Sequence, residues 1–222
     1  MADDWQEWFE RVWEFREESL YPVLFGTQSK GGIHTLTFER FESRFHQTNV
    51  DPRWLTHGVL VFPPTTTSPR WRFVTSGLSN AWEADGPNPN EWSGVGVEFL
   101  LETSHEEPWA LGATLNILAY QLLLAAGRFD GSRRFIELYD GIPLGGPIDG
   151  QSSLVTNLLV CESPSAPDDL QLESGRFALA QLVGVTDVEL EFARTHGDEQ
   201  LVSLLVERAV FPVTDAARAS VV

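Results

Sequence analysis

Residues 94–101 read Gly-Val-Gly-Val-Glu-Phe-Leu-Leu, and this stretch decides the fold class. Every second residue from Val95 to Leu101 is apolar, which is the period of a β-strand that buries one face. Downstream, Pro108 begins a long apolar run that ends before Gly127. Proline suits the first position of a helix and glycine the position after its end, so the run predicts a helix from Pro108 to about Ala126.

The apolar run is also the only stretch that resembles a membrane span. Residues 109–126 carry no formal charge, but Gly112, Thr114, Asn116 and Gln121 interrupt them. The run barely reaches the ~20 residues that a bilayer requires, and no basic cluster flanks it. We therefore expect a buried core helix and no association with a membrane.

The first 25 residues predict an amphipathic helix. Apolar side chains recur at the helical i, i+3, i+4 spacing, at Trp5, Trp8, Phe9, Val12 and Phe15. Asp4 with Glu7 resembles a capping box, and the helix is expected to end before Pro22.

Further strands and helices alternate along the chain without a regular βαβ period. Strand character occurs at Ile33–Phe41, Gly58–Phe62, Arg70–Thr75, Ser153–Cys161 and Arg176–Val183. The run Thr186-Asp187-Val188-Glu189 is a capping box that opens a short helix, and Asp198 starts another. This order predicts the α+β class, with a mixed β-sheet flanked by helices.

The charge balance limits the partners. The 222 residues contain 32 acidic and 15 basic side chains, for a formal charge of −17. Binding to nucleic acid phosphates requires several Lys or Arg per site, so we expect no nucleic acid partner. The same negative field attracts a basic protein, although a solvated surface is the simpler explanation of the charge.

The chain has one cysteine, Cys161, so it forms no intrachain disulfide, which suits a reducing compartment. The N-terminus has no basic region followed by an apolar core, so we expect no signal peptide and a cytoplasmic location.

No motif of catalysis stands out. The five histidines lack a second ligand at metal-site spacing, apart from His105 with Glu106 and Glu107, which is better explained as a surface cluster. Ser76 and Ser79 lack the flanking glycines of a nucleophile elbow. Gly94 and Gly96 fit no phosphate-binding pattern; glycines on a strand let a backbone or an aromatic ring approach closely. We expect no enzyme activity, no metal and no cofactor.

Several segments in one order resemble the suppressor of fused domain family. They are Trp71–Ser79 (Trp-Arg-Phe-Val-Thr-Ser-Gly-Leu-Ser), Ser93–Phe99 (Ser-Gly-Val-Gly-Val-Glu-Phe), Pro108-Trp109 and Leu179–Thr186 with Glu189-Leu190. The segments Val50–Trp54, Gly58–Pro64 and Gly141–Ile148 are similar to the bacterial branch. The resemblance spans roughly residues 20 to 208.

The resemblance implies a single domain with a mixed sheet that holds another protein. The expected organisation is an N-terminal amphipathic helix (1–25) packing on the domain, the suppressor of fused-like domain itself (26–210) and a C-terminal tail (211–222). In the animal relative, a Tyr after the SGLS-like motif and an Asp before the SGxG-like motif contact the partner. By motif position these fall at Trp82 and at Asn90, beside Glu91.

The implied protein-binding residues lie in one loop rich in Pro and Gly: Trp82, Glu83, Asp85, Asn90, Glu91 and Trp92. An aromatic anchor ringed by charge suits protein recognition. The alternative is that both tryptophans fold inward and cap the core.

The leading hypothesis for function is a non-catalytic protein-binding domain, a bacterial immunity protein that sequesters a basic toxin or another protein partner. The alternative is a ligand-binding or enzymatic domain whose site gathers dispersed His and acidic residues. A deep pocket lined by two or more of His34, His46, His57 and His105 would favour the alternative.

Overall fold

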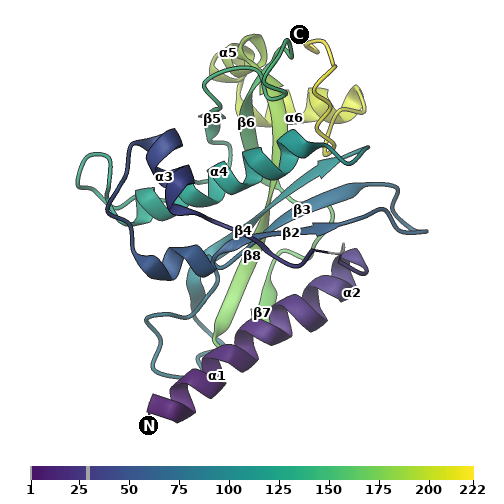
Figure 1. Cartoon of the computed structure of the whole chain (residues 1–222). Helices are drawn as coiled ribbons and strands as arrows, with labels where there is room; N and C mark the ends of the chain where they lie inside the picture. The colour runs from purple at the N-terminus through teal and green to yellow at the C-terminus, as the bar shows by residue number, and fades with distance from the viewer. Residues whose placement is uncertain (1, 29–30) are drawn as a thin grey trace.

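A computed structural model describes residues 2–28 and 31–222 (Figure 1). One eight-stranded sheet has the order β1-β2-β3-β4-β8-β6-β5, and β7 pairs with β8 beside this path. At its centre β4 and β8 run parallel, whereas the other neighbouring strands are antiparallel. The bounds of the strands are β1 His34–Thr35, β2 Gly58–Phe62, β3 Trp71–Ser76, β4 Trp92–Thr103, β5 Gly141–Pro143, β6 Val155–Glu162, β7 Leu170–Leu172 and β8 Gly175–Thr186.

The helices lie on both faces of the sheet (Figure 1). Their bounds are α1 Ala2–Glu14, the π-helical turn η1 Phe15–Leu20, α2 Tyr21–Phe25, α3 Phe38–Phe45, the 3₁₀ turn η2 Pro52–Thr56, α4 Pro108–Ala125, α5 Asp187–His196 and α6 Asp198–Glu207. The predicted α+β class, with a mixed sheet flanked by helices, is confirmed.

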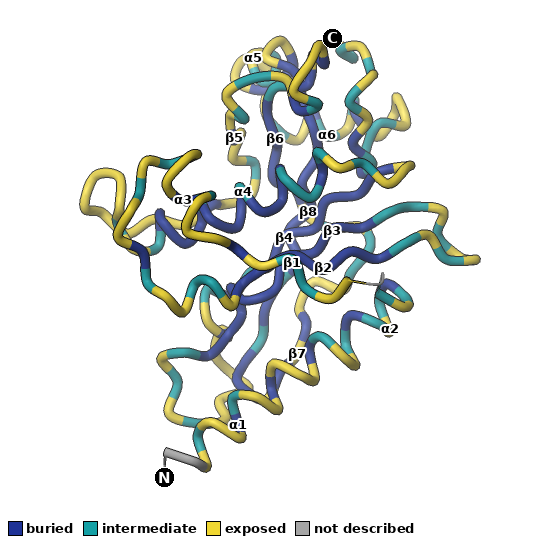
Figure 2. Tube along the Cα trace, in the orientation of Figure 1, coloured by how far each residue is buried: buried dark blue, intermediate teal, exposed yellow. Residues whose placement is uncertain are grey.

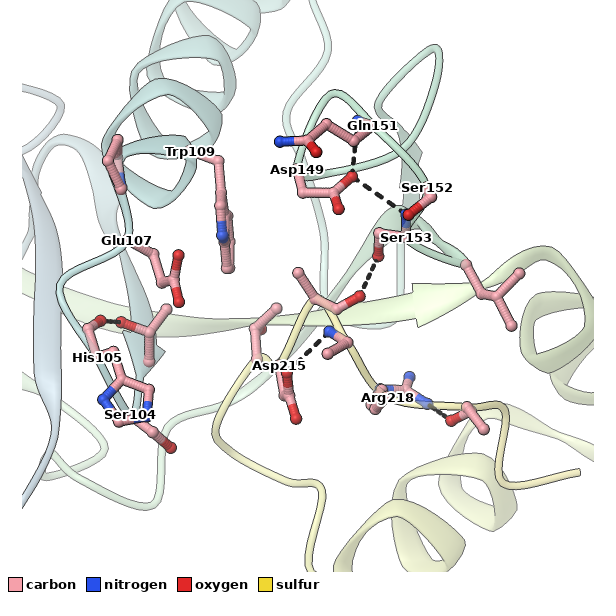
Figure 3. A pocket seen from close by; sticks show the side chains of 17 residues that line it. Ser104, His105, Glu107, Trp109, Asp149, Gln151, Ser152, Ser153, Asp215 and Arg218 are labelled. Carbon is pink, nitrogen blue, oxygen red and sulfur yellow. Dashed lines mark hydrogen bonds between the residues drawn. The ribbon is translucent and has the colours of Figure 1, made fainter.

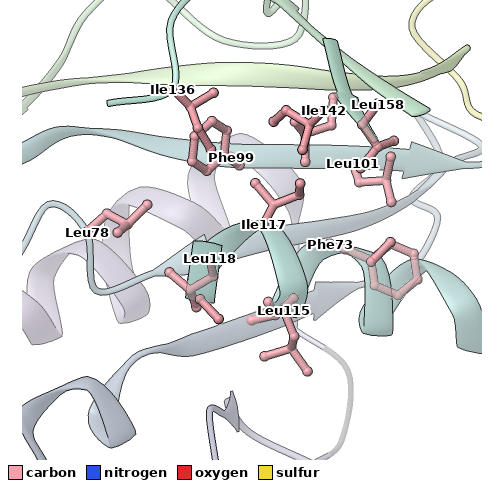
Figure 4. Close-up of a cluster of buried hydrophobic side chains, with 14 of the residues drawn as sticks. Phe73, Leu78, Phe99, Leu101, Leu115, Ile117, Leu118, Ile136, Ile142 and Leu158 are labelled. Carbon is pink, nitrogen blue, oxygen red and sulfur yellow. The ribbon is translucent and has the colours of Figure 1, made fainter. Parts of the chain in front are cut away.

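The alternation read from residues 95–101 decides which side of β4 packs on α4. Val95, Val97, Phe99 and Leu101 belong to one cluster, together with apolar residues of α4 such as Leu118 (Figure 4). The opposite side of β4 carries Leu100, which packs in a second cluster with α1 and α2. Burial of both sides makes β4 the central strand of the core (Figure 2).

The second side of the sheet is covered at two places. The part drawn at the bottom of Figure 1 packs on α1 and α2 through residues such as Leu60 and Phe177. The part drawn at the top packs on α5 and α6 through residues such as Val183 and Leu205. In β8 the odd-numbered residues face these helices and the even-numbered Ala180 and Leu182 face α4, as a two-residue period requires.

The apolar run at Pro108–Ala125 is a buried helix of the core. It is the one described helix whose length and composition would allow it to cross a membrane, and 61% of it is buried inside the protein. Helix α4 begins with Pro108 and is followed by Gly127 in the left-handed region, as predicted. The capping box of α5 is also present, with Thr186 and Glu189 bonded to each other's backbone N–H groups.

The N-terminal segment differs from its prediction in three respects. Helix α1 begins at Ala2, so Asp4 lies inside it rather than at its cap, and the helical path continues past Pro22. The buried positions Trp8, Val12 and Arg16 follow one another at the i, i+4 spacing of an α-helix, and the π turn moves the next buried position to Tyr21. Phe15 is 48% exposed and Arg16 is fully buried, although the spacing had predicted a buried Phe15.

The segment Ile33–Phe41 is not one strand. Only His34 and Thr35 pair with β2, and Phe38 begins α3. Thr37 accepts a hydrogen bond from the Arg40 N–H and caps that helix, a local interaction that outweighs the strand propensity of the residues around it.

The C-terminal residues 211–222 pack against the sheet. Val213 forms a parallel bridge with Glu102, and Thr214 Oγ1 accepts the N–H of Gly184 at 2.8 Å. Arg218 pairs with the buried Glu189 at 2.5 Å. The tail thus covers polar groups of β4, β8 and α5.

Candidate functional site

The candidate loop, residues 82–92, lies between β3 and β4. Its start is held by a carboxylate inside the core. Glu98 of β4 is fully buried, and its carboxylate accepts the N–H groups of Gly77 and Ser79 at 2.9 and 2.8 Å. The hydroxyl of Thr75 donates to the same carboxylate at 2.6 Å. The segment resembling the family's Ser-Gly-Leu-Ser motif is therefore a turn wrapped around a buried anion.

Arg16 joins the N-terminal helical segment to this turn. Its guanidinium donates to Ser76 Oγ at 2.7 Å and to Ser79 Oγ and Asn80 Oδ1 at 2.8 Å, and it lies 3.8 Å from the Glu98 carboxylate. A buried charge is tolerated only when it is paired and hydrogen-bonded, and these contacts meet that condition. The sequence gives no sign of this burial, because the partners lie about 60 or more residues away along the chain.

Two glycines shape the return of the loop into the sheet. Gly94 has φ +58°, and a Cβ there would lie 2.3 Å from the carbonyl oxygen of Leu78. Gly96 has φ +79°, and a Cβ there would lie 3.1 Å from the ring of Trp92. The expectation that these glycines admit a backbone and an aromatic ring is confirmed, and the pairing of β4 with β8 is irregular at this point.

The two tryptophans of the loop have different environments. They are neither both exposed for recognition nor both folded inward onto the core. Trp82 is half-buried, its ring centroid 4.3 Å from that of Phe9 in α1, and the Arg53 guanidinium lies 5.7 Å from the ring. Its Nε1–H is buried and has no hydrogen-bond partner among the described residues. Trp82 therefore fixes the loop against α1.

Trp92, by contrast, is 49% exposed. The guanidinium of Arg176 lies 4.5 Å from its ring centroid, on the side of β8, and bonds to Asp169 at 3.3 Å. A large aromatic ring that is held from one side and open on the other is the usual form of a binding anchor.

The four polar residues predicted for the site all lie at the surface: Glu83, Asp85, Asn90 and Glu91. Within the part of the chain that the structure describes, no ion pair engages these three carboxylates. The loop that carries Trp92 therefore exposes three carboxylates to solvent.

The β7–β8 hairpin is hydrogen-bonded to the loop, a contact that the sequence did not predict. The backbone N–H of Asn88 donates to the carbonyl oxygen of Glu173 at 3.1 Å, and the backbone N–H of Arg176 donates to the carbonyl oxygen of Glu91 at 2.8 Å. Ser93 and Ser174 share a buried hydrogen bond of 2.6 Å. The loop is thus built on strands rather than left free.

The histidines do not gather into a ligand site. Of the five histidines, His105 alone lines a groove that opens on the surface between residues 103–109, 149–154 and 214–219. His57 is buried beside the turn at Gly77. Among the described residues there is no group of three His, Cys, Asp or Glu side chains placed to hold a metal ion. The geometry thus lacks the shared histidine pocket that the alternative hypothesis requires.

Cys161 is buried on β6, where burial raises the pKa of its thiol to about 12. At neutral pH this thiol is protonated and inaccessible, as expected for a structural cysteine.

The architecture is a single α+β sheet, covered by helices on both faces, that presents an acidic and aromatic loop. The model of one family, described as Suppressor of fused protein (SUFU), matches residues 53–219, which is more than half of the chain. The chain therefore belongs to the suppressor of fused family.

Solved structures share the fold of this chain. A putative SUFU homolog from Neisseria gonorrhoeae FA 1090 is similar over 98% of each chain, with a TM-score of 0.60 and 19% identity. A chain from the Sufu-Fu complex matches 96% of this chain and 92% of its own length, with a TM-score of 0.64 and 20% identity.

Drosophila Suppressor of Fused matches 74% of this chain, with a TM-score of 0.57 and 22% identity. This chain spans 42% of the length of the Drosophila chain. No curated protein matches the sequence.

Proposed function

We propose that this protein is a non-catalytic, cytoplasmic binding domain that holds a basic protein partner at the loop 82–92. The observation that carries the proposal is the half-exposed ring of Trp92 on a loop whose exposed carboxylates no described ion pair engages. Membership of a family in which one relative was solved as the Sufu-Fu complex supports the binding of a protein.

The partner class follows from charge. The loop that carries Trp92 also exposes Glu83, Asp85 and Glu91, and the whole chain carries −17. Such a surface attracts a basic protein over distance and rejects an acidic one. A toxin with a basic surface, neutralised by steric cover, is the partner that we propose, and the chain then acts as its immunity protein.

Co-expression tests this proposal. The chain is produced together with a toxic protein encoded beside its gene, and growth of the host cells is measured. Rescue is expected with the unaltered chain, and it should be lost with Trp92→Ala. Trp92→Phe keeps an aromatic ring and should retain part of the rescue. Growth arrest in the presence of the folded, unaltered chain would reject the immunity role.

Paired variants then test the loop itself in binding assays with the purified partner. Trp92→Ala is expected to weaken binding about tenfold or more, as an aromatic anchor does. It should change the free energy of unfolding by less than about 1 kcal/mol, because the ring is half in water. The matched variant Trp82→Ala removes contact with Phe9 and should cost about 2 kcal/mol. If Trp92→Ala binds normally, the loop is not the site.

A further inference from the structure

A second surface lies at the other end of β4, away from the loop 82–92. A groove of about 1010 Å³ opens there between the start of α4, the segment 149–154 and the C-terminal segment 214–219 (Figure 3). Strand β4 has 12 residues, so at ~3.3 Å per residue the two surfaces are separated by roughly 36 Å.

The walls of the groove are fixed by hydrogen bonds to the fold. Ser153 Oγ donates to the carbonyl oxygen of Ala216 at 2.5 Å, which joins two walls. Thr214 is anchored through its N–H to the Glu102 carbonyl at 2.8 Å. A groove with anchored walls can bind a ligand with little entropic cost, because the walls are already ordered.

The charge of the groove is negative and unbalanced. Glu107, Asp149 and Asp215 come from its three walls, and none of them takes part in an ion pair among the described residues. Arg218 also lines the groove, but its guanidinium pairs with the buried Glu189, to which it donates hydrogen bonds of 2.6 and 2.5 Å.

An apolar surface lies beside these carboxylates. Trp109, at the start of α4, is half-buried, and Figure 3 shows its ring next to the carboxylate of Glu107. Leu154, on the opposite wall, is 61% exposed. An indole next to a carboxylate favours a cation that can lie over the ring and bond to the acid, as an arginine or lysine side chain does.

The geometry points to this groove as a second binding site, one that takes an extended segment of another protein carrying arginine or lysine side chains. The open shape admits a peptide, and the three carboxylates have the charge that complements it. The site is independent of the loop 82–92, so either one can fail while the other stands.

The test uses the full chain and the peptide acetyl-Gly-Arg-Gly-Arg-Gly-amide, followed by amide and indole chemical shifts at low salt. Shifts are expected to concentrate at residues 103–109, 149–154 and 214–219 and to include the indole N–H of Trp109. The peptide with Gln in place of Arg should cause none of them. Shifts centred on the loop 82–92, or spread evenly over the surface, would overturn the proposal.

A charge-matched pair of variants separates the groove from the general negative field. The double variant Glu107→Gln, Asp215→Asn should weaken the arginine peptide about five- to tenfold, since each exposed ion pair is worth up to about fivefold. The control Glu199→Gln, Glu207→Gln removes the same charge from the exposed side of α6 and should change affinity less than about twofold. Equal losses in both would show that only the total charge matters and would reject the site.

Discussion

At the scale of single residues, the environment of a side chain matters more than its type. Trp82 and Trp92 lie in the same loop, yet the first packs on Phe9 and the second is half exposed. Arg16 and Glu98 are charged and fully buried, whereas Phe15 is largely exposed. Residue types predicted a recognition loop here, but the role of each tryptophan depends on which helix lies beside it.

His57 gives a prediction for pH dependence. Burial lowers the pKa of its imidazole to about 4, while the nearby Glu98 carboxylate acts in the opposite direction. Its Nδ1 lies 3.1 Å from the Arg53 carbonyl oxygen, which can only accept, so Nδ1 carries the proton of the neutral ring. The unfolded chain has the ordinary pKa of about 6.5. Between pH 6.5 and 4 the unfolded chain therefore binds a proton that the native protein does not.

The contribution of His57 to stability is thus complete above pH 6.5 and is lost as the pH falls toward 4. At about 1.4 kcal/mol per pH unit, acidification from pH 7 to pH 5 should cost about 2 kcal/mol through this residue. Urea unfolding at the two pH values measures the cost, and His57→Gln should reduce the drop by that amount. The exposed His105→Gln is the control and should keep it. An unchanged drop in His57→Gln would mean that the ring is protonated in the native state.

At the scale of elements, local signals predicted some parts of the fold well. The alternation in residues 95–101, the Pro and Gly around α4 and the Thr186 capping box each depend on neighbours in the sequence, and each prediction is confirmed. Sequence reasoning missed β5, β7 and α3 and misplaced the end of the N-terminal helix. Strands β5 and β7 depend on pairing with β6 and β8, and the N-terminal helix depends on the distant contact of Arg16 with the turn at Ser76–Asn80. Helix α3 depends on the local Thr37 cap, a signal that sequence reasoning overlooked.

The connection from η1 to the loop predicts the effect of removing Arg16. Arg16→Met leaves the buried Glu98 carboxylate without its cation, and loss of one partner of a buried pair costs about 3–5 kcal/mol. Because Arg16 also bonds to Ser79 and Asn80, amide hydrogen exchange should accelerate at residues 80–92 before it does in α4.

The double variant Arg16→Met, Glu98→Gln provides the check. It removes the uncompensated charge and should recover about 2 kcal/mol of the loss in denaturant unfolding. If the two single losses simply add, the arginine and the carboxylate do not stabilise each other, and the loop is held by the neutral hydrogen bonds alone.

At the scale of the whole molecule, the C-terminal residues belong to the fold. Burial would raise the pKa of Glu189, but hydrogen bonds from Arg218 and from the N–H groups of Thr186 and Val221 hold it below its ordinary value. Deletion of residues 211–222 removes Arg218 and uncovers β8. We expect the deletion to cost about 4 kcal/mol, close to the effect of breaking a buried ion pair, as measured by urea unfolding. A deletion variant as stable as the full chain would show that the tail only rests on the surface.

The charge of −17 predicts opposite effects of salt on folding and on binding. Repulsion among the acids destabilises the compact protein, so raising the salt concentration from about 0.01 to 0.15 M, which shortens the screening length from about 30 to 8 Å, should raise the free energy of unfolding. Attraction to a basic partner is screened by the same ions, so association should slow while dissociation changes little. Thermal unfolding and binding kinetics across one salt series measure both. Binding that does not depend on salt would mean that the exposed Trp92 acts through apolar contact and that the acids of its loop serve only solubility.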